Sequence, residues 1–77
     1  MVITLYSTSS CIWCAKVREL FKQHKIKYKD IDVGASIKAA QEMIKKSGQQ
    51  SVPVINVNGE IIVGYDENKL KKLLKIK

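Results

Sequence analysis

The sequence predicts an α/β fold in which a four-stranded mixed sheet is covered by three helices, in the order β-α-β-α-β-β-α. Two observations support this prediction. Short runs rich in β-branched residues alternate with stretches of helical periodicity, which is typical of a parallel β-α-β unit with a right-handed crossover. Farther along, Asn58-Gly59 separates two β-rich runs and is the strongest short-range signal of an antiparallel hairpin. The 77 residues suffice for one domain, which we expect to span 1–77.

The chain opens with a predicted strand and a predicted helix. Residues 2–6, VITLY, have the β-branched and aromatic composition of a buried strand. Polar residues follow, and Ser9 and Ser10 are candidate caps for the helix. From Trp13 onward, apolar or bulky side chains form a helical stripe at positions 13, 17, 20, 21 and 24. His24 closes this stripe, and we expect it to be a half-buried residue at the helix end.

A second strand and a second helix come next. Residues 27–33, KYKDIDV, alternate apolar side chains with aspartates, as a strand with one buried side does. Ser36 is a possible cap of the following helix, and Gly48 is a natural stop. The apolar residues at helical spacing within this helix are Ile37, Ala40 and Ile44.

The last part of the chain predicts a hairpin and a third helix. The two strands of the hairpin are 52–57 and 61–63, and they should add antiparallel strands to the same sheet. Asp66 is the expected cap of a helix over 66–77. The apolar face of that helix consists of Leu70, Leu73 and Leu74.

The net charge of the chain is +7, because 14 lysines and arginines stand against 7 acidic residues. The cations are scattered rather than gathered with exposed aromatic residues, so we expect no nucleic-acid binding. Acidic protein partners and anionic small substrates are compatible with this charge. No apolar run approaches the roughly 20 residues of a membrane span, and the first residues lack the features of a signal peptide. We therefore expect a cytoplasmic protein with no membrane contact.

Cys11 and Cys14 lie three positions apart, where a predicted strand gives way to a predicted helix. A structural bridge between them would close a very small loop, and such loops stabilise a fold least. Cytosolic reductants also keep structural thiols reduced. If the helix begins near residue 12, free N–H groups and the helix dipole favour the Cys11 thiolate. The pair is therefore predicted to be a redox-active dithiol, in which Cys11 attacks a substrate disulfide and Cys14 resolves the mixed disulfide.

Other roles for this cysteine pair have less support in the sequence. Structural zinc needs four ligands, and the chain offers two cysteines and the distant His24, so we expect no metal site within one chain. Two inert core cysteines would not explain a C-x-x-C that follows a strand and opens a helix. An iron–sulfur cluster shared by two chains remains an alternative, because exposed thiolates with outside ligands can hold such units. A cluster carrier would purify as a brown dimer, whereas we expect a monomer.

Three separated motifs resemble those of the glutaredoxins, the small glutathione-linked branch of the thioredoxin fold. They are the C-x-x-C at 11–14, the S-V-P at 51–53 and the G-Y-D at 64–66. Two segments carry most of the similarity, LYSTSSCIWCAKVRELF and SVPVINVNGEIIVGYDENKL, and it runs from about residue 2 to residue 75. The resemblance implies a thioredoxin/glutaredoxin-like fold and a thiol-disulfide oxidoreductase that acts on protein disulfides and glutathione mixed disulfides. It also implies no tightly bound cofactor.

The resemblance also assigns roles to residues of this chain. Cys11 would be the nucleophile and Cys14 the resolving cysteine. The peptide bond before Pro53 would be cis, and the backbone of Val52 would pair with glutathione like an added strand. The remaining positions implied to bind glutathione or substrate are Tyr6, Gln49, Gly64, Tyr65 and Asp66. Trp13 either packs in the core or offers a docking surface, and its spacing alone does not distinguish the two.

Three features depart from the family pattern. Ile12 replaces the proline of the usual C-P-Y-C, the stretch before Cys11 contains no lysine, and Val63-Gly64 replaces a Gly-Gly pair. These departures leave a second interpretation open. In it, the chain resembles short redoxins that take electrons from thioredoxin reductase and donate them to ribonucleotide reductase. The expected partners are therefore glutathione or thioredoxin reductase, together with disulfide-containing client proteins.

Overall fold

All seven elements occur in the predicted order in a computed structural model of the chain, which describes residues 2–75. The elements are β1 (Ile3–Ser7), α1 (Ile12–Gln23), β2 (Lys29–Asp32), α2 (Ile37–Ser47), β3 (Val54–Val57), β4 (Glu60–Val63) and α3 (Glu67–Leu74). The predicted extension of the last helix over 76–77 lies outside the described residues. Among the described residues, no helix has the length and apolar composition that crossing a membrane would require.

The four strands form one mixed sheet in the order β2-β1-β3-β4. β1 pairs with β2 in parallel, and α1 forms the crossover between them. β3 pairs antiparallel with both β1 and β4, so the hairpin extends the same sheet as predicted. The turn between β3 and β4 has positive φ at Asn58 and Gly59, 53° and 99°, which matches the preference of two-residue hairpin turns for this dipeptide.

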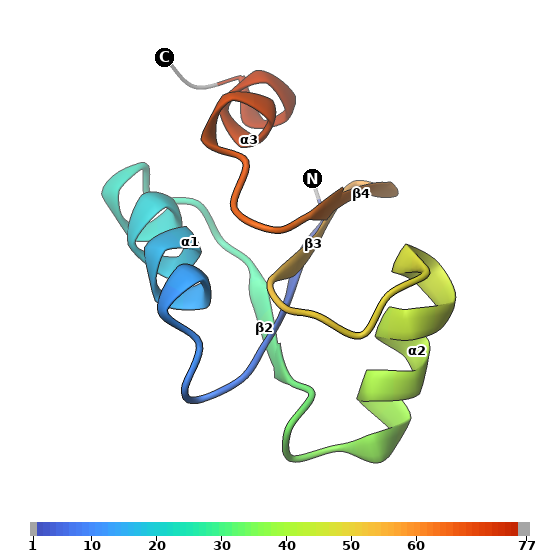
Figure 1. The fold of residues 1–77 in the computed structure, drawn as a ribbon. Coiled ribbons are helices and arrows are strands. Elements are labelled where there is room, and N and C mark those ends of the chain that lie inside the picture. Colours follow the sequence, from blue (N-terminus) through green and yellow to red (C-terminus); the bar gives the residue numbers. More distant parts are fainter. Residues whose placement is uncertain (1, 76–77) are drawn as a thin grey trace.

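The sheet separates two hydrophobic clusters, with α1 and α3 over one face and α2 over the other (Figure 1). Side chains alternate between the two faces of a strand, so odd-numbered residues of β1 and β3 face α1 and α3. The buried residues of this larger cluster are Ile3, Leu5, Val17, Leu20, Phe21, Ile55, Val57, Ile62, Leu70 and Leu74. Those of the smaller cluster on the α2 side are Tyr6, Met43 and Val54.

The start of α1 differs from the prediction. Ser9 and Ser10 do not cap the helix, because the N-cap residue is Cys11, with extended backbone angles of −89° and 112°. The sulfur of Cys11 accepts the N–H hydrogen bond that a cap oxygen would otherwise accept. The chain therefore turns into the helix at the cysteine itself. At the other end, the partly buried His24 is the C-cap residue, as predicted.

The ends of α2 and α3 agree with the sequence. The side chain of Ser36 accepts a hydrogen bond from the Ala39 N–H at 3.2 Å, and Asp66 accepts one from the Lys69 N–H at 3.1 Å. Gly48 follows α2 with φ of 75°, a left-handed conformation that glycine adopts without steric cost.

The apolar face predicted for α2 is not the face that the sheet covers. Ile37 is 80% exposed and Ile44 is 36% exposed, whereas Met43 is 1% exposed and packs with Tyr6 and Val54. The helix has apolar residues on more than one side, so periodicity alone could not select the buried one. The small α2 cluster is filled by one long, flexible methionine side chain rather than by a row of isoleucines.

Met43→Ala should lower the free energy of unfolding by about 2–5 kcal/mol, because it leaves a cavity between α2 and the sheet. Ile37→Ala in the same helix is the matched control, and it should change stability by less than about 0.5 kcal/mol because the side chain is exposed. Urea unfolding of the oxidised proteins measures both. Equal losses in the two variants would contradict the observed orientation of α2.

Candidate active site

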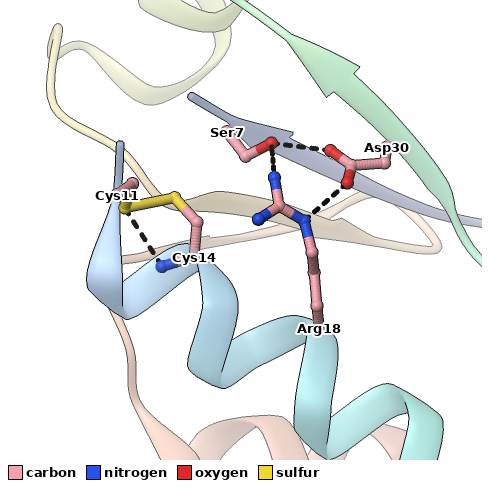
Figure 2. Close-up of a disulfide and its surroundings, with 5 residues drawn as sticks. All are labelled: Ser7, Cys11, Cys14, Arg18 and Asp30. Carbon is pink, nitrogen blue, oxygen red and sulfur yellow. Dashed lines mark hydrogen bonds and ion pairs between the residues drawn. A yellow bond between two sulfur atoms is a disulfide. The ribbon is translucent and has the colours of Figure 1, made fainter. Parts of the chain in front are cut away.

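Cys11 and Cys14 lie where the chain passes from β1 into α1, and their sulfurs are joined in a disulfide (Figure 2). Their Cα atoms are 5.2 Å apart. Three positions along a helical turn bring the two side chains together, as the sequence predicts. Cys11 is half-buried, whereas Cys14 is 0% exposed. An incoming thiol or disulfide can therefore reach the first cysteine, and the second is enclosed by the protein.

The environment of Cys11 favours negative charge on its sulfur. As the N-cap residue of α1, it lies at the positive end of the helix dipole. Its Sγ atom accepts a hydrogen bond from the Cys14 N–H at 3.0 Å. Both interactions stabilise a thiolate over a thiol, which makes Cys11 the expected nucleophile of the reduced pair.

A hollow of about 240 Å³ adjoins this helix start. Its lining combines residues from three separate segments that the sequence singled out: Trp13, Val52, Pro53, Gly64 and Tyr65. The Val52–Pro53 peptide bond is cis, as the resemblance implied. The Gly64 N–H donates to the carbonyl oxygen of Pro53 at 2.8 Å, so the two loops are tied together. Gly64 has φ of 78°, a conformation that side-chain-bearing residues rarely adopt.

Trp13 lies at the surface of this hollow, so the core position that its spacing also allowed is wrong. It is 54% exposed, and its ring centroid lies 5.8 Å from that of Tyr65. The Nζ atom of Lys16 lies 5.4 Å from the Trp13 ring centroid, within the range of a cation–π contact. Next to it, Ile12 is 74% exposed. The side chains between the cysteines therefore form an exposed apolar surface.

The expectation that Tyr6 lines the groove is wrong. Tyr6 is 1% exposed and belongs to the hydrophobic cluster under α2, because even-numbered residues of β1 face that helix. Its hydroxyl donates to a carboxylate oxygen of Glu42 on α2 at 3.3 Å. The side chain is therefore structural.

Gln49 and Asp66 are not among the residues that line the hollow. Gln49 follows α2, and its backbone exchanges hydrogen bonds with the Ser47 hydroxyl. Asp66 uses its carboxylate to cap α3 and lines a different hollow beside that helix. The carboxylate of Asp66 thus already accepts a hydrogen bond from one of the free N–H groups at the start of α3.

Sequence reasoning missed a polar network on the side of α1 that faces the sheet. Arg18 donates from Nε to Asp30 Oδ2 and from Nη2 to the Ser7 hydroxyl, both at 2.7 Å. The Ser7 hydroxyl in turn donates to Asp30 Oδ1 at 2.6 Å, and Ser7 is 0% exposed (Figure 2). The one available signal was that Arg18, the single arginine, follows Cys14 by one helical turn. Its partners come from two strands, which no local pattern could identify.

This network changes the acidity of its neighbours. Partial burial by itself would raise the pKa of Asp30, but the hydrogen bonds from Arg18 and Ser7 and the charge of Arg18 outweigh burial and lower it. Tyr28 packs against Phe21 with tilted rings whose centroids are 4.8 Å apart. Burial and the nearby Asp30 charge raise the pKa of Tyr28, against a smaller opposing effect of Arg18. Asp30 is therefore ionised and Tyr28 neutral at physiological pH.

Within residues 2–75, no group of three or more His, Cys, Asp or Glu side chains is arranged to hold a metal ion.

Comparisons with known proteins agree with this geometry. Residues 3–62 match the family model described as Glutaredoxin. A glutaredoxin-like 8.6 kDa protein in the rubredoxin operon of Clostridium pasteurianum is 40% identical over 74 residues, which cover 96% of this chain and 99% of the relative. The solved structure of the thioredoxin-like protein BC3987 mutant T8A is similar with a TM-score of 0.92 and 28% identity, covering 97% of this chain and 96% of that one. The glutaredoxin-like NrdH-redoxin of Escherichia coli has the same fold, with a TM-score of 0.85 at 20% identity and 95% of each chain covered.

Asp30→Asn should destabilise the protein in a pH-dependent way. Because the pKa of Asp30 is lowered by folding, its ionised form contributes stability that is fully present above 3.8, its ordinary value, and is lost as the pH falls through the folded value. The difference in unfolding free energy between the parent and the variant should therefore shrink below about pH 4. Since the Arg18 and Asp30 side chains are 33% and 35% exposed, added salt should reduce the difference. A difference that is independent of pH would contradict this assignment.

Proposed function

The chain belongs to the glutaredoxin family, and from that premise we propose that it reduces protein disulfides and glutathione mixed disulfides with its Cys11–Cys14 dithiol. Thiol-disulfide oxidoreduction in general follows from the family and the cysteine pair; the substrates and the electron donor are the proposal. The observation that carries it is the contrast between the two cysteines. A half-buried sulfur caps a helix, and a fully buried one lies within bonding distance of it.

The reaction proceeds in two exchanges. The Cys11 thiolate attacks one sulfur of the substrate disulfide, a Cys11–substrate bond forms, and the other substrate sulfur leaves as a thiolate. Cys14 then loses its proton and attacks Cys11 Sγ, which forms the Cys11–Cys14 disulfide and releases the second substrate sulfur. The substrate gains two electrons and two protons, and the dithiol is oxidised. Two thiols of a donor reverse these steps to restore the dithiol.

Glutathione as the donor is supported by the segment that carries the cis peptide bond. Among residues 2–75, no backbone hydrogen bond engages Val52, so its N–H and C=O groups are free to pair with an extended peptide. The adjoining hollow of about 240 Å³ is lined by this residue and by Trp13, Pro53, Gly64 and Tyr65. A short peptide bound there would run beside Cys11 as an added strand. No cofactor needs to be resident for this chemistry.

Thioredoxin reductase as the donor is the second candidate, and specific features of the site favour it. The stretch before Cys11 offers no cation for a glutathione carboxylate, and Asp66 places a carboxylate at the start of α3. Ile12 and Trp13 instead present apolar surface of the kind that protein partners cover. The Escherichia coli NrdH-redoxin is described as a glutaredoxin-like protein with a thioredoxin-like activity profile.

Cys11→Ser should abolish reduction of both substrate types, because the remaining Cys14 is 0% exposed and is out of reach of a substrate disulfide. Cys14→Ser should retain reduction of a glutathione mixed disulfide, where glutathione itself can resolve the intermediate, and should lose reduction of a protein disulfide. Turnover of a glutathionylated peptide and of insulin measures the two activities. Full activity of the Cys11→Ser variant would overturn the proposed mechanism.

The electron donor is tested by reducing the oxidised protein either with glutathione or with thioredoxin reductase and its nicotinamide cofactor. We expect glutathione to reduce the Cys11–Cys14 disulfide, and the decrease of free glutathione measures it. Reduction by thioredoxin reductase alone would instead establish the second candidate.

A further inference from the structure

We propose that Arg18, held in place by Ser7 and Asp30, stabilises the Cys14 thiolate during the step that resolves the mixed disulfide. This inference rests on the proposed dithiol reaction and adds to it a positioning residue outside the cysteine pair. In the resolving step Cys14 must first give up its proton to the solvent, because the thiolate and not the thiol is the nucleophile. The Cys11–Cys14 bond then forms, and the substrate sulfur leaves with the electron pair of its broken bond.

Burial makes this ionisation costly. Cys14 is 0% exposed and lies on the face of α1 that packs against the sheet, beside the buried Val17. Water cannot solvate a sulfur anion there, and loss of hydration disfavours the charged form of any buried group. The compensating charge must therefore come from the protein.

Arg18 is placed to supply that charge. It follows Cys14 by four residues, so the two side chains leave successive turns on one face of α1. Figure 2 shows both side chains extending from the helix toward the end of β1. The guanidinium is partly withdrawn from solvent, with 33% of the side chain exposed. A partly buried charge is screened less than a fully hydrated one, so its field reaches farther into the protein.

The sheet fixes the guanidinium by its own geometry. Ser7 has the same parity in β1 as Leu5, so its side chain faces α1. Asp30 pairs with Leu5 in the parallel register between β1 and β2, which puts its carboxylate on the same face. A guanidinium carries five N–H donors. The two hydrogen bonds to Asp30 and Ser7 hold Arg18 without using all of its donors.

Several other charged or titratable groups lie around the start of α1, but Arg18 is the cation on the side of the helix that faces the sheet. The other groups are Cys11 at the N-cap, Lys16 on α1 itself, Tyr65 after β4, and Tyr28, Asp30 and Asp32 from the β2 segment. The exposed Asp32 pairs with Ser7 in the register, and its carboxylate accepts a hydrogen bond from the Gly34 N–H at 2.8 Å. Lys16 is exposed and lies over the outer Trp13 ring, and Tyr65 contacts that ring as well. β1 contributes the uncharged Ser7, and the Val52–Pro53 segment contributes no titratable group. The negative charge of Asp30 acts against the positive charge of Arg18, so the electrostatic potential at Cys14 depends on the balance of the two charges.

The test follows the two exchanges with dithiobis(nitrobenzoate), an aromatic disulfide that releases a coloured thiolate at each step. The first release reports the attack by Cys11, and the second reports the attack by Cys14 on the mixed disulfide. Stopped-flow traces over a range of pH give the midpoint of each step. The variants are Arg18→Met, Arg18→Lys, Asp30→Asn and the Arg18→Met/Asp30→Asn double variant. Lys22→Met is the matched control, because it removes an exposed cation one turn farther along the same helix.

Arg18→Met should move the midpoint of the second release to higher pH by about half a unit to one unit, which is about a three- to tenfold loss of thiolate at lower pH. Asp30→Asn should move it to lower pH, the double variant should lie near the parent, and Arg18→Lys should keep most of the parent behaviour. Well above both midpoints Arg18→Met should react faster than the parent, since a thiolate of higher pKa is the stronger nucleophile. A purely structural defect would slow the step at every pH.

Shifts in the same direction for Arg18→Met and Asp30→Asn, or shifts no larger than that of Lys22→Met, would overturn the proposal. If Arg18→Met does not fold, the direction of the Asp30→Asn shift decides, because asparagine preserves the size of the side chain. Failure of the proposed function is seen separately. The parent protein would then show no second release at all, whatever residue stands at position 18.

Discussion

The hydrogen bond from the Cys14 N–H to the Cys11 sulfur is the interaction on which the rest of the site depends. It makes Cys11 the cap of α1, so the helix begins at the nucleophile and its free N–H groups surround that sulfur. The same turn carries Cys14 into the interior, where it is fully enclosed. One local backbone geometry thus gives the two cysteines different environments. The accessible sulfur of Cys11 is stabilised as a thiolate, and the sulfur of Cys14 is buried.

The hollow at the start of α1 depends on a second connection, between segments that lie eleven residues apart in the sequence. The Gly64 N–H binds the carbonyl of Pro53, and this joins the loop before β3 to the loop after β4. Antiparallel pairing of Val54 with Val63 brings the two loops to the same end of the sheet, next to the start of α1. A site made from the turn into a helix and two loops at the same end of a sheet can change its residues while the sheet is unchanged. The replacement of a proline by Ile12 and the lysine-free stretch before Cys11 are differences of this kind.

Several residues show why the sequence pattern predicts the helices, strands and turns correctly but misplaces some side chains. Ser36, Gly48, Asp66 and Asn58-Gly59 were correctly assigned because caps and tight turns depend on the nearest few residues. The prediction of Ser9 and Ser10 as caps is wrong, because the sulfur of Cys11 takes the place of the oxygen that usually accepts this hydrogen bond. The prediction of the buried face of α2 is wrong because Ile37 and Ile44 fit a helical period as well as Met43 does. Tyr6 was assigned to the groove, yet strand parity directs it to the opposite face.

The sequence by itself determined the order of the elements, the redox pair at the start of a helix, and the segments around Pro53 and Gly64 that would meet it. The order of the elements and the redox pair follow from local spacing, whereas the role of the Pro53 and Gly64 segments is what the resemblance to the glutaredoxins implies. Only the tertiary structure decided which side chains share a face, because that depends on the register between strands that are distant in sequence. The pairing of Leu5 with Asp30 places an aspartate from β2 on the α1 side, where it meets Ser7 and Arg18. No local pattern encodes that meeting, since it exists only once β1 and β2 have paired and α1 has packed across them.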